Sequence, residues 1–198
     1  MKTSRLEAFS DGVIAILITI MVLELRAPQD AGLAALRPLI PKLMAYVLSF
    51  VVLGIYWNNH HHLFQAAEEL NGTVLWANLH LLFWLSLIPF ATAWMGENQF
   101  ASIPTAAYGA VLFMAGLAYW LLQNRIILHQ GSESILARAI GRDRKGKLSV
   151  ILYGLAIPLA FVHPLIAGAL FVFVAAMWLK PDKRIETTVQ EAVEEAAP

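Results

Sequence analysis

The sequence contains no cysteine among its 198 residues. Disulfide bonds, thiolate metal ligands and cysteine nucleophiles are therefore excluded. Net charge is also absent, because 14 basic residues balance 14 acidic ones. Nucleic-acid binding draws on a basic field that releases counterions from phosphates. The charge balance therefore indicates that nucleic acid is not a partner.

Charge of either sign is scarce. Charged residues make up 14% of the chain, whereas soluble domains usually carry about 25%. Hydrophobic residues make up 59%, and the mean hydropathy is +0.63. A soluble core of this size could not hide so many apolar side chains. We therefore predict an all-α integral membrane protein.

The first hydrophobic stretch, residues 5–25 (RLEAFSDGVIAILITIMVLEL), lacks an apolar run of full membrane length. Its uninterrupted run extends only from Val13 to Leu23, and a lipid-facing helix needs about 20 apolar residues. A spanning helix here must include Asp11 and Glu24. Ionisable groups at membrane depth normally face the bundle interior or water. We expect this helix to face protein and water, with the rest of the chain shielding it from lipid.

A cleaved signal peptide is a poor interpretation of the same stretch. Asp11 interrupts the start of the apolar run, Glu24 follows it, and no small-x-small cleavage site precedes Pro28.

Further apolar segments predict six membrane spans in all. The long block at 148–179 is divided in two at His163-Pro164, because the residue before a proline is biased away from helix. Residues 129–147 form a polar, basic loop that could contain a short interfacial helix. The six spans are predicted at 5–25, 39–64, 70–95, 101–128 and the two halves of 148–179. They form one transmembrane domain, residues 1–180, followed by a charged tail, residues 181–198, that we expect to be exposed and partly disordered.

The distribution of lysine and arginine gives this arrangement a direction. With the N-terminus cytoplasmic, six spans place eleven basic residues inside and three outside, in agreement with the positive-inside rule. Both termini should then be cytoplasmic. The inner residues are Lys2, Arg5, Arg125, Arg138, Arg142, Arg144, Lys145, Lys147, Lys180, Lys183 and Arg184, and the outer ones are Arg26, Arg37 and Lys42.

At 100° per residue the first helix has two different faces. Ile16, Ile20 and Leu23 lie within about 60° of one another, with Thr19 at the edge of this apolar stripe. Arg5 and Phe9 project to the same side, and Asp11 points nearly opposite. Two interpretations remain open. The stripe is either ordinary core, or one subunit's part of a hydrophobic constriction that gates by dewetting.

The remaining polar residues suggest no enzyme or metal site. Three adjacent histidines, His60, His61 and His62, point in different directions on a helix and cannot converge on one ion. His80 could approach them from the third span, and neutral histidines bonded to a neighbouring helix explain the pattern. Asp11 has two possible roles, an interhelical hydrogen bond or a proton relay. No histidine or nucleophile stands at a spacing that implies a triad.

At this point the motifs resemble those of a known family. The segment Phe9-Ser10-Asp11, in its setting, is similar to the first-helix signature of the transmembrane protein 175 family of potassium channels, in particular its prokaryotic members. The likeness continues in Trp57-Asn58-Asn59-His60-His61 and in Asn78-Leu79 with Leu87-Ile88-Pro89-Phe90. In motif terms it covers roughly the first half of the chain.

The resemblance implies a homotetrameric, potassium-preferring channel in the plasma (inner) membrane of a prokaryote, surrounded by lipid and needing no cofactor or metal. Its pore is lined by the first helix, and this sequence also has no TVGYG filter segment. By position, the narrowest constriction falls on Ile16, with Ile20 and Leu23 as further pore positions and Thr19 as the selectivity hydroxyl. The family's motif residues here are Arg5, Phe9, Ser10 and Asp11, with a supporting polar cluster of Trp57, His60, His61 and His80.

A carrier is the alternative to a channel. Asp11, Glu24 and the histidines could serve a proton-coupled secondary transporter, which would show saturable, coupled flux instead of passive potassium flow.

Overall fold

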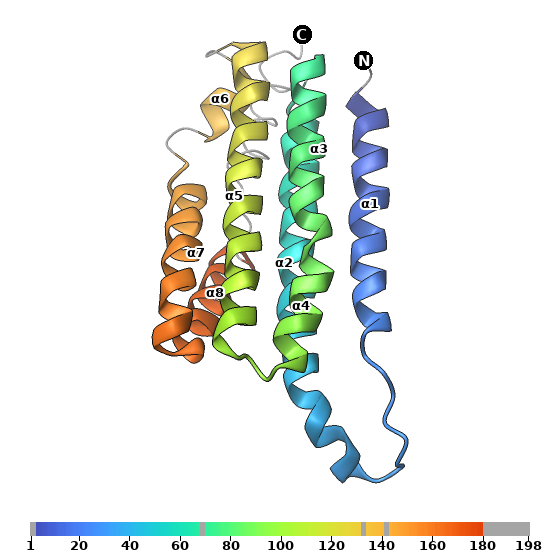
Figure 1. Ribbon diagram of the computed structural model, residues 1–198. Coiled ribbons are helices and arrows are strands. Elements are labelled where there is room, and N and C mark those ends of the chain that lie inside the picture. Colours follow the sequence, from blue (N-terminus) through green and yellow to red (C-terminus); the bar gives the residue numbers. More distant parts are fainter. Residues whose placement is uncertain (1–2, 68–69, 132–133, 141–142, 180–198) are drawn as a thin grey trace.

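The computed structural model describes residues 3–67, 70–131, 134–140 and 143–179, and the described chain is helical throughout with no strand. The helices run up and down as one elongated bundle (Figure 1). In chain order they are α1 (Thr3–Leu23), the 3₁₀ helix η1 (Leu33–Leu39), α2 (Ile40–Gln65), α3 (Gly72–Ser86), α4 (Ile88–Glu97), α5 (Ser102–Gln130), α6 (Ile135–Ile140), α7 (Arg144–Val162) and α8 (Pro164–Leu179). The predicted all-α class is confirmed, and the predicted tail, residues 181–198, lies outside the described residues.

The third predicted segment is broken into two helices. α3 ends at Ser86 and α4 begins at Ile88, with Pro89 in the first turn of α4. A proline removes one backbone donor, and its ring crowds the preceding turn, so a helix interrupts there. The two pieces remain roughly in line in Figure 1. Together they form one membrane-length unit, Gly72–Glu97.

The block at 148–179 is divided at His163, as the proline predicted. His163 is extended (φ −160°, ψ 119°), and Pro164 opens α8. The start of α7 differs from expectation, since the helix begins at Arg144 and not near residue 148. The reason is a cap. The Asp143 carboxylate accepts a hydrogen bond from the Gly146 backbone N–H at 3.1 Å, and such a cap recruits the next, basic turn into the helix.

Within the described ranges, five units are long and apolar enough to cross a membrane, namely α1, η1 with α2, α3 with α4, α5 and α7. The sixth expected span, α8, is an apolar helix of 16 residues. At 1.5 Å per residue it measures about 24 Å, shorter than a hydrocarbon core of about 30 Å.

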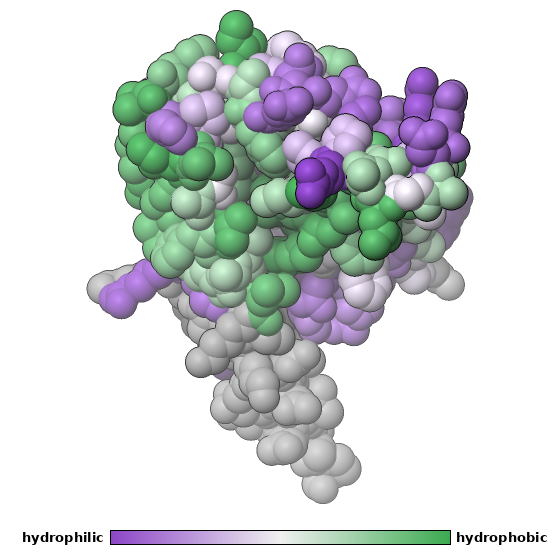
Figure 2. Space-filling view, turned by 90° about the horizontal axis from the view of Figure 1, so that it is seen from below, coloured by the Kyte–Doolittle hydropathy of each residue, from purple (hydrophilic) through white to green (hydrophobic). Residues whose placement is uncertain are grey.

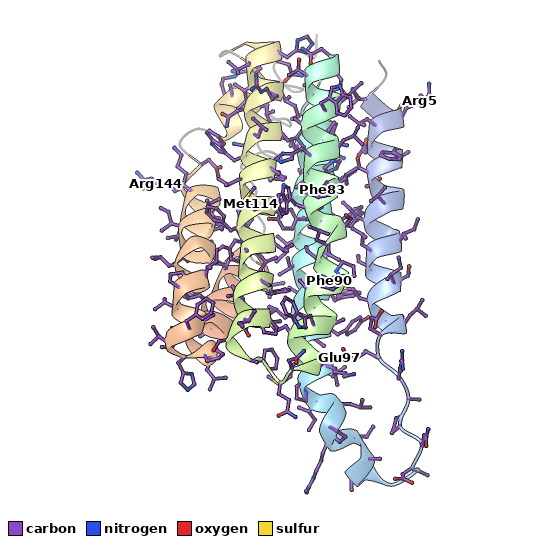
Figure 3. The ribbon with its side chains drawn as sticks, viewed as in Figure 1. Arg5, Phe83, Phe90, Glu97, Met114 and Arg144 are labelled. Carbon is purple, nitrogen blue, oxygen red and sulfur yellow. The ribbon has the colours of Figure 1, made fainter. Side chains whose placement is uncertain are left out.

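The two ends of the bundle differ in charge. One end, uppermost in Figure 1, holds the start of α1, the α2–α3 connection and the segments joining α5 to α7. Arg5 lies at this end, Arg144 lies lower, at about the height of Phe83, and Glu97 lies toward the other end (Figure 3). Six described basic residues lie in α1 or in the stretch from the second half of α5 to the start of α7, namely Arg5, Arg125, Arg138, Arg144, Lys145 and Lys147. Three lie in or just after the α1–α2 connection, namely Arg26, Arg37 and Lys42. Seen from the lower end, hydrophilic residues gather in patches beside large hydrophobic areas (Figure 2).

Candidate functional site

One face of α1 is packed against its own subunit. Ile14 is fully buried, and Leu6, Leu17 and Met21 are nearly so. These residues contact α2, α3 and α4, against which α1 lies. Ser10 is buried on the same face, and its hydroxyl donates to the Leu6 carbonyl at 2.9 Å. This face belongs to the core of the subunit.

The opposite face of α1 carries the apolar stripe and has no cover from the described chain. Ile16 is 58% exposed, Ile20 41% and Leu23 74%. Phe9, about two turns nearer the start of the helix than Ile16, is 52% exposed. The subunit therefore does not use these residues as core, which was the first of the two interpretations. Four large apolar side chains are left for something outside the subunit to cover.

Thr19 lies among these residues and is exposed as well. Its hydroxyl donates to the Ile16 carbonyl of the preceding turn, with an oxygen–oxygen distance of 2.9 Å. A hydroxyl has one donor and two acceptor lone pairs. Since the donor is committed to the helix, the Thr19 oxygen presents only lone pairs outward, which suits a cation or its hydration water.

A directed chain of hydrogen bonds crosses three helices behind this stripe. The Asn78 amide donates to Ser10 Oγ at 2.9 Å, so its Oδ1 is the acceptor that faces His60 Nε2 at 2.8 Å. His60 is therefore the Nε2–H tautomer. All three side chains are fully buried. Buried polar groups need such partners, and the chain ties α1 to α2 and α3 at one level.

A second pair of contacts lies closer to the surface. Trp57 Nε1–H donates to Asp11 at 3.0 Å, and His61 Nδ1 lies 2.6 Å from the Glu7 carboxylate. Glu7 and Asp11 are four residues apart on α1, and Trp57 and His61 are four residues apart on α2. The two contacts therefore lie one helical turn apart. The Trp57 and His61 rings are nearly parallel, with centroids 6.2 Å apart. These two contacts fix both the height and the rotation of α1 against α2.

The structure brings together most of the residues singled out by sequence. Ser10, Asp11, Trp57, His60 and His61 all join α1 to its neighbours. His80 lies apart, because its Nε2 accepts a bond from Trp84 of its own helix at 3.0 Å. Arg5 is exposed at the start of α1 (Figure 3).

Two participants were given no site role from the sequence, namely Glu7 and Asn78, of which Asn78 was quoted only as part of the family motif. A carboxylate four residues before Asp11, and an amide within an apolar span, were the available signals for them. For metal binding, no group of three or more His, Asp or Glu residues within the described ranges is placed to hold an ion.

The fold and this helix define a multi-span helical membrane protein whose first helix is anchored on one face and bare on the other. Comparison with known proteins gives the family. The model of the endosomal/lysosomal potassium channel TMEM175 matches residues 5–89. A protein named as a potassium channel in Chryseobacterium sp. (strain P1-3) is 53% identical over 191 residues, 96% of this chain and 100% of that protein. The chain belongs to the TMEM175 family.

A solved structure extends the likeness to the fold. The crystal structure of a lysosomal potassium-selective channel TMEM175 homolog from Chamaesiphon minutus superposes with a TM-score of 0.79 at 28% identity, covering 91% of this chain and 97% of that one. Human TMEM175, named an endosomal/lysosomal proton channel, is 27% identical over 148 residues, which are 66% of this chain and 29% of the human protein. The family and these relatives are channels, which confirms both the resemblance and the expectation that the chain is not an enzyme.

Proposed function

We propose that four copies of this chain form a potassium-permeable, potassium-preferring channel whose pore is enclosed by the four α1 helices. The observation that carries this proposal is the bare stripe of Ile16, Ile20 and Leu23 on a helix whose other face is anchored. A single helix cannot enclose a pore, and a symmetric ring of copies covers the stripe while keeping it in contact with water.

In this arrangement Ile16 forms the constriction, with Ile20 and Leu23 continuing the apolar lining. A hydrophobic neck gates by dewetting and forces an entering cation to lose part of its hydration. Potassium loses water at lower cost than sodium, so the neck favours potassium. Thr19, one turn from Ile16, offers oxygen lone pairs that compensate part of the lost hydration.

We further propose six spans with both termini cytoplasmic, in the plasma membrane of a prokaryote. In support, six of the nine described lysines and arginines lie in α1 or between the second half of α5 and the start of α7, and three lie in or just after the α1–α2 connection. Basic residues concentrate on the cytoplasmic side. The 16-residue α8 crosses the membrane if the bilayer thins locally or flanking residues reach the interface.

The geometry does not favour the proton-coupled carrier. Asp11 and Glu24 are 13 positions apart along α1 and its end, a separation of about 20 Å at 1.5 Å per residue. Asp11 is bonded to Trp57, whereas Glu24 borders a small hollow with Lys42 and Glu97 at the opposite end. No single relay site can use both carboxylates.

Ion flux through the purified protein in liposomes tests the proposal. We expect passive potassium flux exceeding sodium flux, single-channel steps, and tetramers on cross-linking. Ile16→Asn should raise the flux by roughly tenfold, equivalent to about 1.4 kcal/mol of barrier, and weaken the preference for potassium. Ile16→Val, which keeps the apolar neck, is the matched control. Saturable flux coupled to protons, or an Ile16→Asn variant with unchanged conductance and ion preference, contradicts the proposal.

A further inference from the structure

A cavity of about 50 Å³ lies between α2, α5, α7 and α8, away from α1. Its walls include the rings of Tyr56, Tyr119, Tyr153 and Trp178, and no charged side chain is among its lining residues. About 10–15 Å³ holds one water, whereas benzene occupies a cavity of about 150 Å³. The cavity therefore has room for a small polar head group and not for an aromatic ring.

The polar groups of this cavity divide into two sets. Tyr119 donates its hydroxyl to the Asn59 carbonyl at 3.0 Å, and Ser149 Oγ accepts from Trp178 and donates to the Lys145 carbonyl. The hydroxyls of Tyr56 and Tyr153 and the Asn59 side-chain amide, by contrast, make no hydrogen bond within the described part of the chain. They are not among its fully buried atoms that lack a partner, so they are open to a small molecule. Donors and acceptors without partners in such a place are suited to an external hydroxyl group.

An apolar groove of about 460 Å³ adjoins the cavity between α2 and α8. On α2 it runs from Leu43 to Val51, about 12 Å at 1.5 Å per residue. The cavity begins at the next residue, Val52, and Ala175 of α8 lines both hollows. All the groove residues are aliphatic or methionine, so the groove accepts a hydrocarbon chain.

The two hollows follow one another along α2, with the cavity toward the basic start of α7. Gly146 and Ser149, from the first two turns of α7, border the cavity. These turns also carry Arg144, Lys145 and Lys147, and charges at a span's end lie at the membrane–water interface. The groove lies on the first half of α2, farther from this interface than the cavity.

We propose that the cavity and groove together bind a single-chain, uncharged amphiphile with a hydroxyl head group. The head group bonds the Tyr56 and Tyr153 hydroxyls, and the alkyl chain lies along the groove between α2 and α8. An ionised head group is disfavoured because no charged side chain lines the cavity, and an unpaired buried charge is costly. This site is independent of the proposed pore.

Photo-affinity labelling of the full chain in detergent tests the site, with an n-decanol analogue that carries a diazirine on its alkyl chain. We expect saturable labelling of the α2 and α8 peptides that border the groove. Unlabelled n-decanol should compete, whereas decane, without a hydroxyl, and decanoate, with a charge, should compete poorly. The double variant Tyr56→Phe/Tyr153→Phe keeps both rings and should weaken competition by roughly fivefold for each hydroxyl that binds.

Tyr46→Phe is the matched control, because Tyr46 is on α2 but borders neither hollow. It should leave labelling unchanged, and size-exclusion elution should be the same for all variants. Unsaturable labelling spread over all exposed helices overturns the proposal, as does undiminished competition in the double variant. Stronger competition by decanoate overturns the uncharged head group. Ion flux is not measured, so failure here leaves the proposed channel untouched.

Discussion

The two faces of α1 have opposite chemistry and opposite surroundings. The packed face has buried polar contacts through Ser10 and fully buried Ile14. The bare face has large apolar side chains and one hydroxyl, with Leu23 74% exposed. In a water-soluble protein the arrangement would be reversed, with apolar side chains on the packed face and polar side chains on the exposed face.

The difference teaches how a membrane helix can be held from one side. Apolar side chains gain little from packing on each other in lipid, so small residues and interhelical hydrogen bonds do much of the joining. On one face those bonds come from the Ser10–Asn78–His60 chain and from the contacts of Trp57 with Asp11 and of His61 with Glu7. The other face is then free to assemble with copies of itself.

The strongest test of this contrast places the same substitution on both faces. Ile14→Asn puts an amide into a fully buried position and should lower the free energy of unfolding by about 3 kcal/mol. Ile16→Asn should lower it by less than about 1 kcal/mol, because a side chain facing a pore meets water. Denaturant unfolding in detergent measures both. Equal losses would mean that Ile16 is packed like Ile14.

The second test removes the middle of the buried chain. Asn78→Leu leaves the His60 Nε2–H without an acceptor and Ser10 without its amide donor, and each orphaned group costs about 1–3 kcal/mol. We expect a loss of about 2 kcal/mol by the same unfolding measurement, after partial relaxation. The matched control is Asn98→Leu, at the exposed residue that follows α4, where the amide bonds only the Trp94 carbonyl. A loss no larger than the control's would show that the buried chain does not hold α1.

A smaller loss of stability is expected when the Trp57–Asp11 hydrogen bond is removed. Trp57→Phe keeps an aromatic ring beside His61 but removes the N–H that donates to Asp11. Because Asp11 is only half-buried, water can replace the bond, and the loss should be about 1 kcal/mol. Trp76→Phe, at a position 75% exposed, controls for the change of ring. If both variants unfold alike, the Trp57–Asp11 bond does not contribute to the packed face.

The sequence predicted those features that depend on local rules. Proline predicted the break at His163, and helical periodicity separates Ile16, Ile20 and Leu23 from Asp11. The break at Leu87, within the span predicted at 70–95, was not predicted. The predicted start of α7, near residue 148, was wrong because the basic residues after Asp143 are typical of a loop. Only the cap contact shows that they begin a helix. The 3₁₀ helix η1 was not expected at all.

The contacts between helices could not be predicted in the same way. Periodicity groups the residues of α1 into faces, but which face is packed depends on the placement of α2, α3 and α4. The pairing of Glu7 with His61 needs the relative height of two helices, which no spacing within one helix contains. His80 had a local partner at i+4, Trp84, and the sequence does not say whether a local or a distant partner prevails.

The smallest expected effect concerns the single hydroxyl of the bare face. Thr19→Val preserves the shape of the side chain but replaces the oxygen that faces outward with a methyl group. Unfolding should change little, because the residue is exposed. The preference for potassium over sodium in liposome flux should fall by roughly threefold, less than 1 kcal/mol, since the cation loses one compensating oxygen per subunit.

Thr19→Ser should restore most of the preference, and Thr73→Val, exposed on α3, should leave it unchanged. An unaltered preference in Thr19→Val would assign discrimination to the apolar neck alone, and the bare face would then act only as a barrier to water.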